Sequence, residues 1–211
     1  MIEQRSPEWF AARVGKITGS RMSALFAKGR GGAESTERRN YRAQLACERL
    51  TGKPTDNGHS SLAMKVGTER EPDAVALYQA VTGELVATAS FIEIPGYPAG
   101  ASPDGLINAD GVLEAKCPNR ATHIDYMRLA SGACPPEYAH QIQCEIWAAD
   151  RAWCDFISYN PDFPESASLI IRRVARDDKL IDAMREAVNI FNAEIEEEIA
   201  MIKDYMTQVA A

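Results

Sequence analysis

The clearest periodic pattern lies near the end of the chain. Apolar residues recur there at gaps of three and four, as on one face of an α-helix. They are Ile181, Met184, Val188, Phe191, Ile195, Ile199, Ile202, Met206 and Val209. This pattern predicts a long helix over about 178–206. We expect its apolar stripe to pack on the protein's own sheet, and a contact between subunits is the alternative.

The first 82 residues predict helices. Ser6, Pro7 and Glu8 are typical of the cap, first position and first turn of a helix, and Gly15 suits its end. Further helices are predicted over 20–27, over 36–50 with Thr36 as the cap, and from Ser60 or Ser61 to about 82 with a kink at Pro72. The three glycines within 29–32 predict a basic, irregular loop.

The centre of the chain predicts strands. The runs 85–94, 100–107, 112–116, 153–159 and 168–174 are rich in apolar and β-branched residues. Asp110-Gly111 predicts a hairpin turn between the second and third runs. Two further helices are predicted, over 122–130 and 136–149.

Together these elements predict an α/β fold with a central mixed β-sheet and helices on both faces. We expect a single domain over 1–211, with a helical part over about 1–82, a sheet over about 83–176 and a final helix over about 177–211.

Composition narrows the class of protein. No apolar run approaches the roughly 20 residues of a membrane span, and the N-terminus lacks a secretory signal pattern. We therefore expect a cytoplasmic protein with no membrane partner. The five cysteines include no CxxC pair, which predicts reduced, mostly buried thiols and argues against a disulfide framework, a zinc ribbon or an iron–sulfur cluster.

Charge is unevenly distributed along the chain. The net charge is −7, but residues 1–53 hold eleven bases and five acids, whereas 177–211 hold three bases and nine acids. Such a chain can offer a basic face to DNA while staying acidic overall, and a solvated helical surface is the alternative.

The candidate chemistry lies in the predicted hairpin. Asp104 near the end of one strand can lie beside Glu114 on the next, and strand alternation puts Glu114 and Lys116 on one face. Two neighbouring carboxylates disfavour joint ionisation unless a cation compensates them. Hard oxygen ligands suit Mg²⁺ or Mn²⁺, with the backbone carbonyl of Ala115 as a further ligand. An ordinary surface hairpin is the alternative.

Four ordered motifs resemble one family. The residues 102–106 (SPDGL) with 113–118 (LEAKCP) resemble the PD-(D/E)xK nuclease core as it occurs in the phage lambda exonuclease and YqaJ-like viral recombinase family. The residues 9–20 (WFAARVGKITGS) are similar to the family's W-x(3)-R-x-G-x-I-T-x-S signature. The residues 67–71 (GTERE) resemble its G-x(3)-E segment, and 138–147 (YAHQIQCEIW) its Y-x-x-Q-x-Q-x-x-x-W helix.

The resemblance implies roles for the catalytic residues. Asp104 and Glu114 would be the main metal ligands, Glu71 a further acid, Lys116 the catalytic lysine and Gln141 an active-site residue that positions the nucleophile or the lysine. Each has a structural alternative: Glu71 as a surface acid, for example, or Gln141 as the partner of a buried backbone group. Pro72 directly after Glu71 leaves the reach of Glu71 open.

The resemblance also implies a pocket for a 5′-phosphate, formed by Arg13, Ser20 and Ser102. Thr122 stands where the family has a further basic residue, and Arg120 is the candidate to replace it. Arg13 pairing with Glu3 or Glu8 is the structural alternative. We interpret His123 and His140 as structural or surface residues, because the family uses no histidine there.

The implied activity is Mg²⁺-dependent 5′-to-3′ digestion of double-stranded DNA ends, which leaves 3′ overhangs for recombination by strand annealing. A homotrimeric ring, a single-strand annealing protein as partner, and a phage or prophage gene in a bacterial cell are further implications. The alternatives are a PD-(D/E)xK nuclease of another polarity, either RecB-like or restriction-type, and an inactive module that binds DNA ends.

Overall fold

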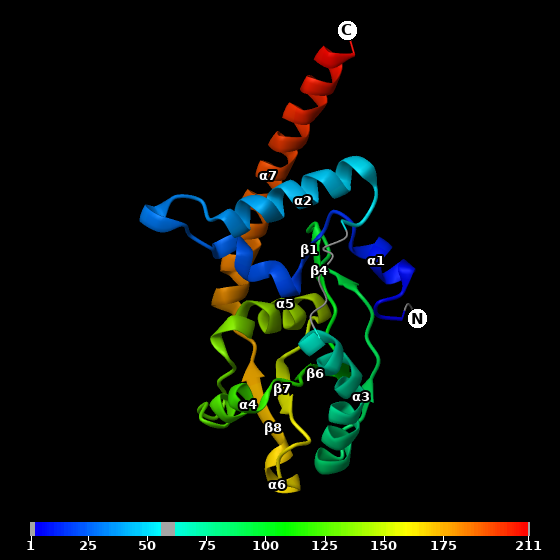
Figure 1. Cartoon of the computed structure of the whole chain (residues 1–211), viewed down its shortest axis with the longest axis vertical. Coiled ribbons are helices and arrows are strands. Elements are labelled where there is room, and N and C mark those ends of the chain that lie inside the picture. The colour runs from blue at the N-terminus through cyan, green and yellow to red at the C-terminus, as the bar shows by residue number, and fades with distance from the viewer. Residues whose placement is uncertain (1–2, 56–61, 211) are drawn as a thin grey trace.

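The computed structural model describes residues 3–55 and 62–210, which form a mixed α/β structure with two sheets (Figure 1). The larger sheet has five strands in the order β2-β5-β6-β7-β8. Its strands are β2 (Val86–Ala87), β5 (Gly105–Ile107), β6 (Gly111–Lys116), β7 (Trp153–Tyr159) and β8 (Leu169–Ala175). The pairing of β6 with β7 is parallel and the others are antiparallel, so the predicted mixed sheet is confirmed.

The smaller sheet corrects two predicted strands. It has the order β1-β4-β3, with β1 (Ile17–Thr18), β3 (Ile92–Glu93) and β4 (Ala99–Ala101). The predicted strand 85–94 is in fact two short strands in different sheets, and the predicted strand 100–107 likewise divides into β4 and β5. The break at Ser102 to Asp104 matters for function because it carries two of the candidate site residues from one sheet to the other.

Helices lie on opposite faces of the large sheet, as predicted. The helix α5 (Ala139–Ala149) follows a short 3₁₀ turn (Pro136–Tyr138), and its Ile142 and Ile146 join a core that includes Val112 of β6. On the other face, Ala74 and Tyr78 of α3 (Leu62–Thr82) pack with Leu113 and Ala115 of the same strand. Because alternate residues of β6 enter different cores, the side chains of Glu114 and Lys116 lie on the α5 face.

The N-terminal segments differ in detail from the predictions. Ser6 caps α1 (Pro7–Arg13) as predicted, but residues 20–27 lie mostly in a 3₁₀ helix, η1 (Gly19–Phe26). The next helix, α2 (Thr36–Thr51), is capped by Ser35 and not by Thr36. The glycine-rich segment contains one short 3₁₀ turn, η2 (Arg30–Gly32), and the suggested caps Ser60 and Ser61 lie outside the described residues.

The remaining helices are α4 (Arg120–Met127), α6 (Glu165–Ser168) and α7 (Asp178–Val209). The short helix α6 has no counterpart among the predicted elements. Cys144 and Cys154 are buried, Cys47 is exposed, and all five cysteines are free thiols, so burial is less general than predicted.

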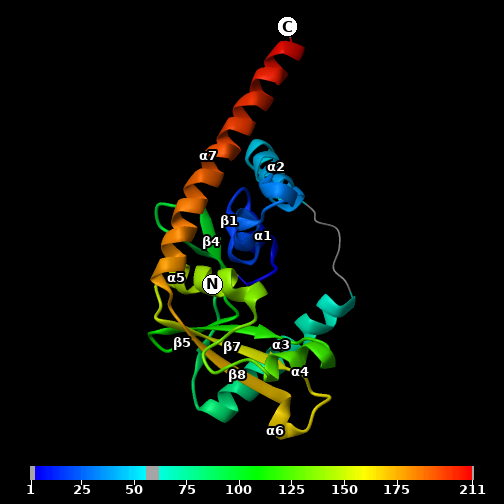
Figure 2. The ribbon, with the colours of Figure 1, turned by 90° about the vertical axis from the view of Figure 1, so that its left-hand side faces the viewer.

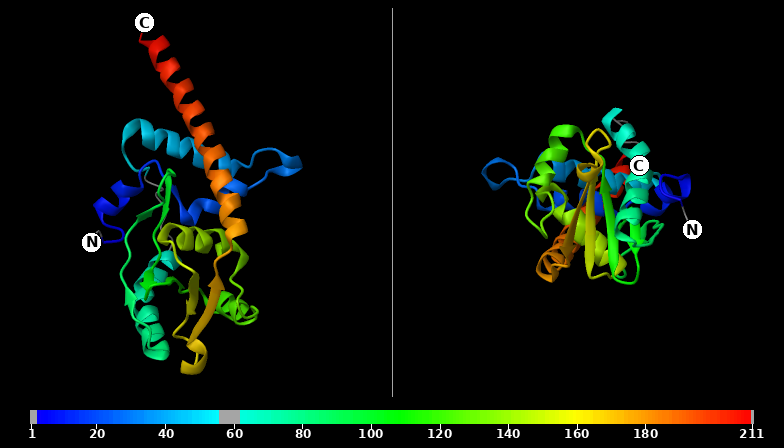
Figure 3. Two further views of the ribbon diagram at one scale, coloured as in Figure 1. Left: turned by 180° about the vertical axis from the view of Figure 1, so that it is seen from behind. Right: turned by 90° about the horizontal axis from the view of Figure 1, so that it is seen from below.

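The long helix α7 crosses α2 and extends beyond the rest of the protein, as Figures 1 and 2 show. Its stripe from Ile181 to Ile199 is buried within the chain, but α7 packs mainly against α2, α5 and η1, so the prediction that the stripe packs on the sheet is wrong. Met206 and Val209, which continue the stripe, are 60% and 69% exposed. Figure 3 shows the same free end of the helix from behind.

Ion pairs between α2 and α7 correct the interpretation of the charge pattern. Arg38 donates two hydrogen bonds to Glu194, at 2.7 and 3.0 Å. Arg42 pairs with Glu198 at 3.1 Å, and Arg49 with Glu196 at 2.6 Å. The basic N-terminal and acidic C-terminal segments therefore neutralise each other, and these three arginines are not available as a DNA-binding face.

Candidate active site

The hairpin of β5 and β6 brings Asp104 and Glu114 together. The backbone N–H of Asp104 donates to the carbonyl of Leu113 at 2.9 Å, which extends the ladder by one residue beyond β5. The Asp104 carboxylate then accepts a hydrogen bond from the N–H of Ala115 at 2.7 Å. Lys116 Nζ donates to Glu114 Oε1. The three side chains thus share one end of the hairpin, as the sequence predicts.

Helix α5 adds Gln141 to this group. Its side-chain amide donates from Nε2 to Glu114 Oε1 at 2.6 Å and to Glu145 Oε1 at 2.9 Å. Gln141 and Glu145 are four residues apart in α5, so their side chains lie on the same helix face. The amide therefore bridges one carboxylate on the sheet and another on the helix.

Glu145 is the site residue that the sequence predictions omitted. It is 1% exposed, and its second oxygen, Oε2, has no hydrogen-bond partner among the residues that the structure describes. The available signal was an acid four residues after Gln141, on the helix face that carries the predicted active-site amide. We call Asp104, Glu114, Lys116, Gln141 and Glu145 the carboxylate cluster.

Burial dominates the electrostatics of the carboxylate cluster. It raises the pKa of Glu114 to about 7; the Lys116 charge opposes this shift and the Asp104 charge adds to it. Burial also raises the pKa of Glu145 well above its usual range, and the charge of Glu114 raises it further. For Lys116, burial alone would lower the pKa, but Glu114 and Asp104 outweigh it and the pKa is raised.

Glu71 approaches from α3 and faces an arginine. Its carboxylate accepts from Arg5 Nη2 at 2.8 Å. Burial raises the pKa of Glu71, the hydrogen bond from Arg5 opposes the shift, and the charge of Asp104 adds to it. Glu71 therefore lies near enough to sense Asp104, although its hydrogen bonds are made to Arg5.

The chemistry of the carboxylate cluster fits a hard divalent cation. Asp104 and the buried Glu114 repel one another, and two such carboxylates are a donor set that Mg²⁺ or Mn²⁺ would compensate. In residues 3–55 and 62–210, no three His, Cys, Asp or Glu side chains already converge in an arrangement that encloses a metal ion. In this structure, Lys116 and Gln141 donate hydrogen bonds to Glu114, and Arg5 donates to Glu71.

The candidate phosphate pocket is partly assembled. The Arg13 guanidinium stacks on the Trp9 ring, 3.9 Å from its centroid, and its Nη1 lies 3.5 Å from Ser102 Oγ. Trp9 Nε1 donates to the same Ser102 oxygen at 3.0 Å. Burial lowers the pKa of Arg13, which shows a partly desolvated cation. Among the described residues, Arg13 forms no ion pair with Glu3 or Glu8, which was the structural alternative.

Ser20 and Arg120 are not joined to Arg13 or Ser102 by hydrogen bonds in the described structure. Ser20 is exposed at the start of η1, next to the buried Gly19. Arg120, the first residue of α4, pairs with Asp162 at 2.8 Å and its side chain is 73% exposed. The structure thus groups Arg13 with Ser102 and leaves Arg120 in a surface ion pair.

The two histidines have packing roles. His123 is fully buried, with Nδ1 2.7 Å from Ser158 Oγ and Nε2 2.9 Å from the carbonyl of Ala167. His140 stacks on Phe26 with ring centroids 4.6 Å apart, and burial lowers its pKa. Both contacts agree with the interpretation of these residues as structural.

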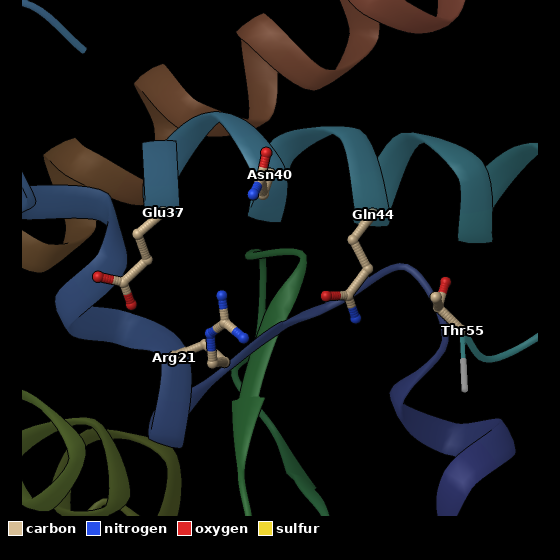
Figure 4. Close-up of a pocket in the computed structure, with 5 residues that line it drawn as sticks. All are labelled: Arg21, Glu37, Asn40, Gln44 and Thr55. Carbon is tan, nitrogen blue, oxygen red and sulfur yellow. The ribbon is translucent and has the colours of Figure 1, made fainter. Parts of the chain in front are cut away.

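A separate hollow lies between η1 and α2 (Figure 4). It has a volume of about 570 Å³ and is lined by Arg21, Glu37, Asn40, Gln44 and Thr55. No residue of the carboxylate cluster lines this hollow, so the candidate active site lies elsewhere.

Comparisons with known proteins agree with the geometry, first at the level of the fold. The structure resembles that of a phage-related exonuclease from Haemophilus somnus, with a TM-score of 0.69 at 14% identity, covering 89% of this chain and 96% of that one. This likeness shows a shared α/β fold, a mixed sheet flanked by helices.

The family follows from closer matches. Residues 8–152 match the model of the YqaJ-like viral recombinase domain. An alkaline exonuclease, LHK-Exo from Laribacter hongkongensis, is 40% identical with a TM-score of 0.86, covering 97% of this chain and 100% of that one. Its complex with dAMP matches equally, with a TM-score of 0.87. The chain belongs to the YqaJ-like viral recombinase family, which confirms the resemblance, and its core is of the PD-(D/E)xK type.

A search among curated proteins gives no match. Over the described residues, none of the helices combines the length and the apolar character that crossing a bilayer requires.

Proposed function

We propose that this protein is a Mg²⁺-dependent exonuclease that degrades the 5′-ended strand of double-stranded DNA and leaves 3′ single-stranded overhangs. One observation carries the proposal. Asp104, Glu114 and Lys116 meet at one end of a hairpin, with Gln141 2.6 Å from Glu114, in a chain 40% identical over 97% of its length to an alkaline exonuclease.

Asp104, Glu114 and the carbonyl of Ala115 would hold the metal, with Glu71 as a further acid once it leaves Arg5. When bound, Mg²⁺ or Mn²⁺ would supply Lewis acidity and would lower the pKa of a water molecule. The ammonium group of Lys116 would hold the attacking water and offset the negative charge that develops on the phosphate. Gln141 keeps Glu114 in place.

The direction of digestion follows from the pocket of Arg13 and Ser102. A guanidinium that is partly desolvated and has no carboxylate partner within residues 3–55 and 62–210 is suited to a phosphate, which it can bind through two parallel hydrogen bonds. A terminal 5′-phosphate held there would place the first phosphodiester near the carboxylate cluster. Ser20 would add a hydroxyl, whereas Arg120 would have to leave Asp162 to take part.

We also propose an oligomeric state, a protein partner and a cellular location. A homotrimeric ring around DNA would retain the substrate between cuts, and the exposed apolar residues Met206 and Val209 at the end of α7 offer surface for contacts between subunits. A single-strand annealing protein would take up the exposed strand, in a bacterial cell that carries a phage or prophage.

The test is digestion of linear duplex DNA labelled at one 5′ end, with Mg²⁺ and then with a chelator. We expect labelled mononucleotides to be released only with metal, and only from a 5′-phosphorylated strand at full rate. Lys116→Ala should lower activity by about 100- to 1000-fold, as when a group that stabilises transition-state charge is removed. Lys179→Ala, which changes an exposed lysine in the first turn of α7, is the matched control.

Each result discriminates between the proposed activity and its alternatives. Equal activity in Lys116→Ala and the wild type would remove the mechanism. Release from 3′ ends, or internal cutting, would favour a RecB-like or restriction-type nuclease. DNA-end binding without turnover in the wild type would identify an inactive module.

A further inference from the structure

Glu145 is a buried acid with incomplete hydrogen bonding. It lies on α5, is 1% exposed, and only Oε1 of its carboxyl group accepts a hydrogen bond, from Gln141 at 2.9 Å. The other oxygen, Oε2, is buried and accepts no hydrogen bond from the described residues, and the carboxyl group of Glu145 lies within hydrogen-bonding reach of Glu114. Burying a polar group in this state is energetically unfavourable, so its presence calls for a physical explanation.

The Gln141 amide explains what Glu145 can contribute. An amide nitrogen has two hydrogens, and Nε2 uses them on two different carboxylates, Glu114 at 2.6 Å and Glu145 at 2.9 Å. One acceptor from each of these carboxylates fixes both the plane of the amide and the position of its nitrogen. With only Glu114 as an acceptor, the amide could rotate about its last torsion, which has a broad minimum.

The orientation of the Gln141 amide affects the position of the Glu114 carboxylate. Gln141 and Lys116 both donate to the same oxygen, Oε1. The second oxygen is therefore the one that can face a metal ion, and the angle of the carboxylate depends on the two donors that hold Oε1. A change in the Gln141 rotamer would release one of these donors.

We propose that Glu145 is a positioning residue of the nuclease site: its carboxyl group fixes the side-chain amide of Gln141, and through it the carboxylate of Glu114. This inference rests on the proposed function, because it assigns a consequence for metal binding and turnover to an arrangement within the carboxylate cluster. In the proposed role, Glu145 itself contacts neither metal nor DNA.

A purely structural Glu145 makes the opposite prediction. Replacing a buried, poorly paired acid by an apolar side chain of similar volume is often neutral or stabilising. A structural role therefore predicts that Glu145→Met is at least as stable as the wild type and equally active. The positioning role predicts a protein that is equally or more stable but impaired in turnover.

The experiment compares Glu145→Met and Glu145→Gln in the full chain, with Glu186→Met as the control for loss of an exposed acid. Steady-state digestion of 5′-phosphorylated duplex gives kcat and KM, Mn²⁺ calorimetry gives metal affinity, and thermal unfolding gives stability. We expect Glu145→Met to lower kcat and weaken Mn²⁺ binding by about 10- to 100-fold, as for other residues that orient metal ligands, with little change in KM. Glu145→Gln keeps an oxygen acceptor for Gln141 and should recover most of this loss.

Two results would overturn the inference. One is a Glu145→Met variant with kcat and Mn²⁺ affinity like those of Glu186→Met. The other is a Glu145→Gln variant as impaired as Glu145→Met, because acceptance of the Gln141 hydrogen bond would then not be the contribution of Glu145.

A further variant covers the case in which Glu145→Met does not fold. Glu145→Asp keeps the charge but withdraws the acceptor by one methylene group, so it should show the same loss of kcat, and an unchanged kcat would refute the inference. Lys116→Ala separates the two hypotheses. If Lys116→Ala is inactive while all Glu145 variants are normal, only the role of Glu145 is wrong; if Lys116→Ala is fully active, the proposed function itself is wrong.

Discussion

The substitution Arg13→Lys tests how the protein would select a 5′-phosphate. The Arg13 guanidinium stacks flat on Trp9 at 3.9 Å and reaches Ser102 only weakly, at 3.5 Å, so its remaining N–H groups are free to meet an anion. Lysine keeps the positive charge but has no planar fork and no face to stack. The variant therefore removes the paired hydrogen bonds to the phosphate while the net charge stays the same.

The size of the effect follows from the bonds that are lost. A hydrogen bond to a charged group contributes about 1.5–3 kcal/mol. Losing one of the two bonds that a guanidinium makes to a phosphate should lower kcat/KM for 5′-phosphorylated ends by roughly 10- to 150-fold. A 5′-hydroxyl end cannot make these bonds, so its kcat/KM should change by less than about threefold.

The assay is the ratio of kcat/KM values on two duplexes that differ only in the terminal phosphate. The duplex with a 5′-hydroxyl end serves as an internal control for folding and for metal binding. If Arg13→Lys lowers both values equally, the residue acts through general stability or charge. If the ratio of the wild type is already near one, Arg13 and Ser102 are not a phosphate pocket.

Two further predictions concern stability. Arg38→Met removes the two hydrogen bonds to Glu194 and one to the carbonyl of Leu25, and should lower the free energy of unfolding by about 1–3 kcal/mol; a urea midpoint like that of the wild type would contradict it. In metal-free buffer, the folded-state pKa of Glu114 of about 7 exceeds its ordinary value of 4.5. The folded protein then binds more protons than the unfolded chain between these values, so stability should fall as pH rises from about 4.5 to about 7. Glu114→Gln should lessen this fall, which urea unfolding across that pH range would measure, and an equal fall in the variant would contradict the assignment to Glu114.

The sequence predicted the centre of the site because the relevant contacts are local. Asp104 and Glu114 belong to adjacent strands joined by a short turn, and the alternation of β6 alone puts Glu114 and Lys116 on one face. Gln141 followed from the family resemblance. Glu145 did not, because an acid in a helix of mixed polarity indicates a buried role only when the structure shows what the helix packs against.

Predictions from composition were less successful where the partner is distant in sequence. The basic residues of α2 indicated a candidate DNA-binding surface. In the structure, however, Arg38, Arg42 and Arg49 pair with acids about 150 residues later, in α7. Similarly, the run 100–107 has one strand-like pattern, but a change of sheet at Ser102 to Asp104 divides it. Neither outcome has a signal within a short window of the sequence.

What the sequence by itself determined is most of the helices and strands, the hairpin, and the grouping of Asp104, Glu114 and Lys116, since these depend on periodicity, turn residues and short spacings. Only the tertiary structure decided that α5 presents Gln141 and Glu145 to Glu114, that Arg13 lies on Trp9 beside Ser102, and that Arg120 pairs with Asp162. The physical reason is that packing between elements distant in the chain sets both the distances and the dielectric environment on which hydrogen bonds and charges depend.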